Sequence, residues 1–240
     1  MLSDALALLE LVLVGFSLPL WHFSYAQDYD RVDADVAQFD KVIEVKRLDF
    51  EKLPANPSDK GWVKLKINYM VDIDQYLRET VLNLPWEQHY DKVETQHFYD
   101  LMMPRWKRID TGNTEDLRGL MRIYTWFKIS VFGEDTSEKA WLLAQHADLD
   151  RAFQREVLKL LEGLFPNHEV LPKNYAYLYD RVTWYADEKP QRYATQGMCK
   201  GPSDWEPHPT EDMAHVDTRR AEMGMVPWVE QKKVLDPYCH

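Results

Sequence analysis

Cysteine is scarce in this chain, and the spacing of the two that occur excludes the common cysteine-based sites. Cys199 and Cys239 are the only cysteines among 240 residues, and they form neither a CxxC pair nor a Cys/His pattern of the zinc type. This pattern leaves two states open. The two residues can pair in a disulfide outside the cytoplasm, or they can remain free thiols.

Short motifs of catalysis and cofactor binding are also missing. The sequence has no glycine-rich phosphate loop, no Walker motif, no serine nucleophile elbow and no haem-attachment CxxCH. A metal site built from His146, Asp148 and Asp150 is the sharpest alternative, but side chains at i, i+2 and i+4 diverge on a helix unless the helix breaks at Ala147. We therefore expect no cofactor and no bound metal.

Positive charge is in short supply as well. Lys and Arg number 29 against 40 Asp and Glu, which gives a formal net charge of −11 without any basic cluster. This balance argues against a nucleic-acid partner held through its phosphates. Apolar residues are plentiful, since 45% of the chain is hydrophobic and 13% is aromatic, and this is enough for the core of one domain of ordinary size.

The longest apolar run covers residues 5–26, with Glu10 near its start and His22 near its end. About 20 apolar residues suffice for a helix to cross a bilayer. A secretory signal peptide would begin with a basic region, whereas the first basic residue of this chain is Arg31. An apolar surface on every side would be unusual for a core helix in a protein of this size. We expect residues 1–28 to be a membrane anchor or an uncleaved signal-like segment.

The residues after the apolar run bear on its orientation. Four acidic residues follow it, and neither flank carries the Lys/Arg excess that marks the cytoplasmic side of a membrane helix. We expect the body of the protein to be extracytoplasmic, on the periplasmic side of a bacterial membrane. The four residues are Asp28, Asp30, Asp33 and Asp35.

Residues 29–72 are expected to be a linker followed by a β arm. Within residues 41–71 the apolar side chains Val63, Leu65, Ile67 and Tyr69 alternate with polar ones, as in a half-buried strand. A loop rich in proline precedes this segment, and residues 41–50 alternate in part. The pattern predicts two antiparallel strands.

From residue 73 onward the pattern is helical, and we expect residues 73–240 to form one helical domain. It predicts a helix over Asp74–Leu84 stopped by Pro85, a second over Glu87–Met103 stopped by Pro104, and a third capped by Asn113. The fold class is therefore mainly α, with a small antiparallel β arm. The tail from Val226 is expected to dock against the body or against a neighbouring molecule.

The stretch from Trp141 to Gln154 is the most informative part of the helical region. Asp135 and Glu138 have the spacing of a capping box, which predicts a helix that runs to His146. Asp148 is then expected to cap a second helix that ends near Gly163 and Pro166. The two helices would meet next to His146.

Four motifs in the second half of the chain carry a resemblance to a known family. They are Trp-Leu-Leu-Ala-Gln-His-Ala-Asp at 141–148, Ala-Tyr-Leu-Tyr-Asp-Arg-Val at 176–182, Gln-Arg-Tyr-Ala-Thr-Gln at 191–196, and Val-Asp-Thr-Arg-Arg-Ala-Glu-Met-Gly at 216–224. Through them residues 129–230 resemble a bacterial domain family of unknown function, and this resemblance implies no activity. Ala194 stands where the family pattern has Gly. If that glycine admits a ligand or another backbone, a methyl group would obstruct it.

The polar residues of these motifs suggest one hypothetical active site. His146 would act as general acid or base, with Asp150 or Asp180 as its orienting partner. Arg181, Arg219 and Gln196 would anchor an anionic or carbonyl substrate. The candidate catalytic residues are His146, Asp150, Asp180 and Arg181, and the candidate substrate-binding residues are Gln191, Tyr193, Gln196, Arg219 and Arg220.

The same residues also have a structural interpretation. A carboxylate and a guanidinium held between helices make hydrogen bonds that fix the packing of those helices. On a strand, Gln191 and Tyr193 would face one way and Gln196 the other, so that all three cannot line one pocket unless the strand ends at Thr195.

Two functions therefore compete. The first is an accessory or structural subunit that packs against a larger membrane complex, touching other subunits and lipid through residues 5–26. It is favoured by the apolar segment, the nine tryptophans and the lack of a catalytic motif. The alternative is an exported hydrolase or transferase with a His/Asp/Arg site. A small-ligand binding module is a third possibility, and it would need a cleft but no general base.

Overall fold

The computed structural model describes residues 29–82 and 89–239. The prediction of a mainly helical fold with a small antiparallel sheet is confirmed. The helices are α1 (Asp30–Glu51), α2 (Lys60–Leu82), α4 (Lys92–Tyr124), α5 (Ile129–Phe132), α6 (Glu134–Gln145), α7 (Arg151–Leu164), α8 (Pro172–Tyr185), α9 (Val216–Glu222) and α10 (Trp228–Leu235). The strands are β1 (Gly197–Gly201) and β2 (Asp204–Pro207), and short 3-10 turns cover Phe165–Asn167, Met213–His215 and Asp236–Tyr238.

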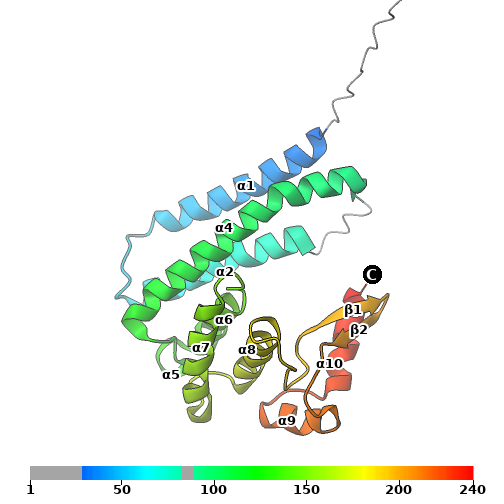
Figure 1. Cartoon of the computed structure of the whole chain (residues 1–240). Coiled ribbons are helices and arrows are strands. Elements are labelled where there is room, and N and C mark those ends of the chain that lie inside the picture. Colours follow the sequence, from blue (N-terminus) through cyan, green and yellow to red (C-terminus); the bar gives the residue numbers. More distant parts are fainter. Residues whose placement is uncertain (1–28, 83–88, 240) are drawn as a thin grey trace, which may run out of the picture.

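Three long helices, α1, α2 and α4, form an elongated arm, and the remaining elements form a more compact body below it (Figure 1). The predicted β arm over residues 41–71 is therefore wrong, because these residues belong mostly to α1 and α2. In the part of α2 before residue 72 the buried side chains are Val63, Ile67 and Met70, which follow the helical period, while Leu65 is 49% exposed. The alternation of apolar residues was a coincidence within a helix whose apolar face packs on other helices.

Helix α4 passes through two residues that were expected to delimit helices. Pro104 lies inside the helix, and Asn113 is a buried interior residue instead of a cap. The helix actually begins at a capping box in which the Asp91 side chain accepts hydrogen bonds from two backbone N–H groups and Glu94 accepts one from Asp91 N–H. Because most helix stability in proteins comes from tertiary packing, the buried residues Met102 and Ile109 on either side of Pro104 keep the helix continuous.

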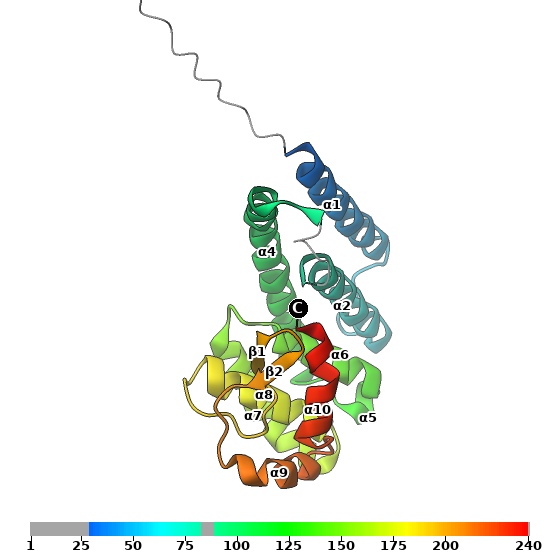
Figure 2. The ribbon, with the colours of Figure 1, turned by 90° about the vertical axis from the view of Figure 1, so that its right-hand side faces the viewer.

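The hydrophobic residues form two separate cores. We call them the arm core, built around Phe39, Leu77 and Phe98, and the body core, built around Ile67, Leu117, Phe127, Phe153 and Leu178. Helices α2 and α4 contribute side chains to both cores, one end of each helix to the arm and the other to the body. Figure 2 shows these two helices running from the arm into the body. The two parts of the molecule thus share continuous helices.

Helices α6 and α7, which flank the end of the first motif, begin with caps other than the predicted ones. Helix α6 begins after Gly133, whose φ of +84° suits glycine, and no side chain caps it, so the predicted capping box at Asp135 is wrong. Helix α7 is capped by Asp150, which accepts a hydrogen bond from Phe153 N–H, instead of by Asp148. The predicted ends were correct, since His146 is the C-cap of α6 and α7 ends at Leu164.

The predicted membrane anchor at residues 1–28 lies outside the described residues. Within the residues that are described, no helix combines the length and the apolar character that crossing a membrane requires.

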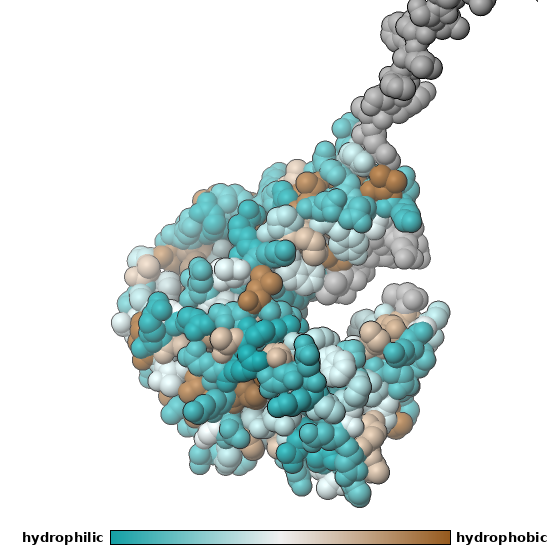
Figure 3. Space-filling model, in the orientation of Figure 1, coloured by the Kyte–Doolittle hydropathy of each residue, from teal (hydrophilic) through white to brown (hydrophobic). Residues whose placement is uncertain are grey.

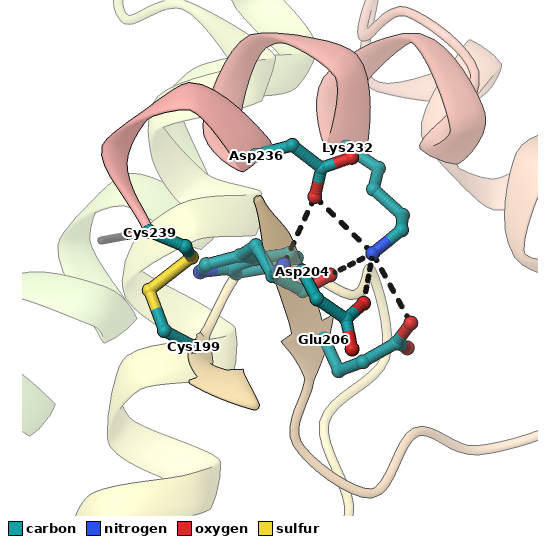
Figure 4. Close-up of a disulfide and its surroundings, with 7 residues drawn as sticks. Cys199, Asp204, Glu206, Lys232, Asp236 and Cys239 are labelled. Atoms are coloured by element: carbon teal, nitrogen blue, oxygen red, sulfur yellow. Dashed lines mark hydrogen bonds and ion pairs between the residues drawn. A yellow bond between two sulfur atoms is a disulfide. The ribbon is translucent and has the colours of Figure 1, made fainter. Parts of the chain in front are cut away.

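The C-terminal tail packs against the β1–β2 hairpin of the same chain. Docking against the body was one of the two predicted alternatives. Cys199 of β1 and Cys239 form a disulfide across 40 residues of sequence, with 5.4 Å between their Cα atoms (Figure 4). Beside it the Lys232 ammonium of α10 lies between three carboxylates, at 3.0 Å from Asp204, 3.2 Å from Glu206 and 3.2 Å from Asp236. The disulfide and this charge cluster fasten the last helix to the sheet.

Candidate functional site

His146, the central residue of the first motif, forms a buried pair with a residue of the arm. Its Nδ1 lies 2.9 Å from Oδ2 of Asp74, a residue of α2 that is only 1% exposed. The Asp74 carboxylate also accepts hydrogen bonds from Gln75 and from Arg78. The orienting partner of His146 is therefore Asp74, and neither Asp150 nor Asp180 occupies that place.

Arg78 extends this pair into a larger polar cluster. Its guanidinium bridges Asp74 and Asp110, with Nη2 at 3.1 Å from Oδ1 of Asp110, and it lies over the Trp106 ring. The indole N–H of Trp106 donates to Asp110 at 2.8 Å. Burial raises the pKa of the Asp110 carboxyl above its usual value, although the charge and hydrogen bonds of Arg78 oppose this rise.

We call Asp74, Arg78, Trp106, Asp110 and His146 the junction cluster, because they lie near the boundary of the two cores. On α2 the cluster follows the body-core residues and alternates with the arm-core residues. On α4 Trp106 packs against the arm core, and Asp110 lies between the two sets. A paired and hydrogen-bonded polar layer of this kind fixes the register of the helices that contribute to it.

One side chain of the junction cluster, that of His146, has a ring nitrogen available for acid–base chemistry. The His146 side chain is 16% exposed, and no described residue bonds its Nε2. A carboxylate on Nδ1 holds the ring in one tautomer and leaves Nε2 as a proton acceptor. The arrangement can therefore move a proton at Nε2, if a substrate reaches it.

Asp148, the last residue of the first motif, lies at the centre of a second polar group. Arg181 makes a bidentate contact to its carboxylate, with Nε at 2.8 Å from Oδ1, and Arg151 and Gln154 donate to the same oxygen. Burial alone would raise the pKa of Asp148, but Arg181, Gln154 and Arg151 outweigh it and hold this pKa below the usual range. Arg181 thus pairs with Asp148, and it also donates to Gln196 Oε1 at 3.3 Å.

Asp180 has a structural role that is clear from its contacts. Its fully buried carboxylate accepts hydrogen bonds from the backbone N–H groups of Arg192, Tyr193 and Thr195 and from the Thr195 hydroxyl, at 2.7–3.1 Å. Burial raises the pKa of the Asp180 carboxyl, and these hydrogen bonds oppose the rise. Asp180 therefore holds the segment 191–196, which we call the clamp loop.

The clamp loop is not the predicted strand. Gln191 folds back onto it, since its Oε1 accepts from the N–H groups of Thr195 and Gln196 and its Nε2 donates to the Gln196 carbonyl at 2.7 Å. The turn places Ala194 at φ +55°, in the left-handed region. As a result Gln191, Tyr193 and Gln196 are all buried within one loop, so the predicted opposite orientations on a strand are wrong.

Because of the left-handed conformation of Ala194, we expect replacement by glycine to change the stability of the protein in opposite directions at two buried alanines. Ala194→Gly should stabilise the protein by about 0.5 kcal/mol, because a left-handed L-residue costs about 1–2 kcal/mol and this outweighs the loss of one buried methyl group of about 0.8 kcal/mol. Ala176→Gly, in the regular helix α8, should instead cost about 2 kcal/mol, because the helix preference of alanine and the buried methyl group are both lost. Urea unfolding of both variants measures the two differences, and destabilisation of equal size by both would contradict this account.

The two arginines of the last motif also bind the chain's own backbone. Arg219 donates to the carbonyl groups of Arg192, Glu211 and Asp212. Arg220 is fully buried and donates to Tyr193 O at 2.8 Å, to Val226 O at 2.7 Å and to the Gln231 side chain at 3.2 Å. The contacts of these two residues do not include the His146 side chain.

The candidate residues thus fall into separate groups. His146 belongs to the junction cluster, Asp150 caps α7 and pairs with Arg118, and Arg181 pairs with Asp148. The described residues contain no group of three or more side chains suited to hold a metal ion.

Sequence reasoning missed the remaining residues of the junction cluster. Asp74 and Arg78 are four residues apart on α2, and Trp106 and Asp110 are four apart on α4, so each pair lies on one helix face beside apolar residues. Asp74 and Arg78 lie in the helix predicted over Asp74–Leu84, but spacing within one helix does not indicate its contact with His146, which lies 72 residues later in the sequence.

Comparisons with known proteins extend the resemblance noted from the motifs. Comparison with curated proteins and with solved structures gave no match. A family model described as a family of unknown function, DUF6624, matches residues 63–239, which start well before the motifs and include all of the junction cluster. Because this match covers most of the chain, the protein belongs to the DUF6624 family.

Proposed function

We propose that the chain is a membrane-anchored accessory or structural subunit that packs against a larger membrane protein complex and has no catalytic role of its own. The observation that carries this proposal is that polar residues of the motifs form hydrogen bonds with other parts of the same chain. Asp180 accepts four hydrogen bonds from the clamp loop, and the fully buried Arg220 has three acceptors in its own chain. Side chains committed in this way fix loops in place instead of contacting a substrate.

Two features support a body outside the cytoplasm. The apolar run at residues 5–26 has the length of a bilayer-crossing helix. Cys199 and Cys239 form a disulfide, and such bonds persist mainly in oxidising compartments. On this proposal residues 5–26 contact lipid and partner subunits, and the body faces the periplasm of a bacterial cell.

Helix α1 offers a surface for a protein partner. Val45 and Leu48 on its outer side are 50% and 47% exposed, and they line a shallow hollow of about 440 Å³ beside Asp49 and Lys52. Apolar side chains within a charged rim are typical of protein contact surfaces. Figure 3 shows apolar residues on the arm within a largely polar surface. Val45 and Leu48 lie towards the C-terminal end of α1, roughly 22–27 Å along the helix from its start, so they would contact a part of the partner that projects from the membrane.

Site-specific photo-crosslinking in the native membrane tests this proposal. A photoreactive residue at position 48 of the full chain should give one discrete adduct with a membrane protein, and the chain should copurify with that protein in mild detergent. The same residue at position 149, where Leu149 is 59% exposed on the body, serves as the matched control and should give no adduct. Recovery of the chain as a lone soluble monomer without adducts would refute the accessory role.

One observation favours the second candidate, an exported hydrolase or transferase. The Asp74 carboxylate orients His146 and leaves Nε2 open, which is the arrangement of a general base. Hydrolysis of ester or phosphoester substrates by the purified chain, lost in His146→Gln with an unchanged melting temperature, would establish this candidate in place of the accessory role.

A further inference from the structure

A surface pocket of about 430 Å³ lies between the end of α4 and the second half of α7. It is remote in sequence from the motif residues of the clamp loop, and none of the candidate site residues lines it. A volume of this size suits a small molecule. The lining residues are Arg118, Met121, Arg122 and Thr125 from the α4 side and Glu156, Lys159 and Leu160 from α7.

The floor of this α4–α7 pocket is apolar. Met121 is a buried member of the body core, and the half-buried Leu160 packs against the same core. The pocket therefore opens onto the edge of the body core, where an apolar group of a ligand would be removed from water. Burial of such a group favours binding.

Arg118 lines the pocket and is held in place by two ion pairs. Its Nη1 donates to Glu156 at 3.0 Å and its Nη2 donates to Asp150 at 2.7 Å, while the guanidinium lies 4.6 Å from the centre of the Phe153 ring. These contacts hold its position and neutralise its charge. They also occupy Glu156, the carboxylate of the pocket.

Two further cations at the rim remain uncommitted. Arg122 and Lys159 are exposed, and neither forms an ion pair with any carboxylate in the described ranges 29–82 and 89–239. The Arg122 guanidinium folds along α4, since a Cβ added at Gly119 would lie 3.6 Å from its Nη2. In a chain with a net charge of −11, the pocket thus presents two free positive charges next to an apolar floor.

We propose that the α4–α7 pocket binds a small organic anion that carries an apolar group. Arg122 and Lys159 bind the carboxylate or phosphate of the ligand, and its apolar part lies on Met121 and Leu160. Arg118 pairs with Glu156 and offsets the negative charge of this carboxylate. This site is separate from the junction cluster and from the outer side of α1, so it does not depend on the proposed accessory role.

Methyl NMR of the full chain in lipid nanodiscs tests this binding directly. With ¹³C-methyl methionine, the Met121 signal, assigned through Met121→Leu, reports on the pocket floor. The probes are 4-phenylbutyrate, its neutral counterpart 4-phenylbutanol, and inorganic phosphate. We expect 4-phenylbutyrate to shift the Met121 signal to saturation, and both other probes to bind at least tenfold more weakly.

Two pairs of substitutions separate the pocket from general electrostatics. Arg122→Gln with Lys159→Gln should weaken 4-phenylbutyrate binding at least tenfold. Lys64→Gln with Lys107→Gln removes the same charge at exposed positions outside the pocket and should leave the affinity unchanged. The other methionine signals check that each variant is folded. Equal affinity in both pairs, equal binding of 4-phenylbutanol, binding of phosphate as tight as that of 4-phenylbutyrate, or no Met121 shift at millimolar probe would overturn the proposal.

Discussion

Asp180→Ala should destabilise the protein by about 3–5 kcal/mol, the largest effect that we expect from one substitution. The change leaves three backbone N–H groups and the Thr195 hydroxyl without their acceptor in a buried loop. Each unsatisfied buried donor costs about 1–3 kcal/mol. Partial hydration of the clamp loop in the variant reduces the total cost of the four donors. Urea unfolding followed by far-UV circular dichroism measures the loss.

Asp187→Ala is the matched control for this variant. Asp187 follows α8 and pairs with Arg155 on the surface, where ion pairs contribute about 0–1 kcal/mol. The control should therefore lie within that range of the wild-type stability. A loss below about 1 kcal/mol for Asp180→Ala would show that the clamp loop is held mainly by its other contacts, such as those of Gln191 and Arg220.

Replacement of both cysteines by alanine should cost about 4 kcal/mol. The disulfide closes a loop over 40 residues of sequence, and it restricts the unfolded chain by an entropy that corresponds to about this free energy. The loss should be seen as a lower urea midpoint of the Cys199→Ala, Cys239→Ala variant under non-reducing conditions.

Reduction of the wild type provides an independent check of the same bond. Dithiothreitol should lower the stability of the wild type towards that of the double variant, and it should have no effect on the double variant itself. The contacts of Lys232 with Asp204, Glu206 and Asp236 remain in both proteins, so the comparison isolates the covalent link. Coincident unfolding curves for oxidised wild type and double variant would contradict this prediction.

Local patterns predicted the second half of the fold better than the first half. Helix α7 ends where the sequence predicted, and α6 ends next to His146 as expected. The segment 63–69 was misread because Val63 and Ile67 satisfy both the strand and the helix period. What decides between the two is the packing of Ile67 against distant helices, which short-range pattern does not contain.

In the candidate site, too, the sequence indicated some residues and not others. His146 was singled out because it is a polar residue among apolar neighbours, whereas its partner Asp74 lies 72 residues earlier in the sequence. The role of Asp180 was missed for a different reason, because its partners are backbone N–H groups, which every residue except proline provides. The left-handed turn at Ala194 was equally hidden, since alanine does not signal it.

The continuity of α2 and α4 through both cores has a consequence for modularity. A fragment that begins at residue 129, where the motif resemblance starts, would lack Ile67, Met70 and Leu117 and would expose the face on which they pack. Arm and body should therefore exchange their amide hydrogens as one cooperative unit, with no stable intermediate that retains only one of them. The smallest autonomously folding piece of this chain has to include the arm helices α2 and α4, as the extent of the family match from residue 63 also suggests.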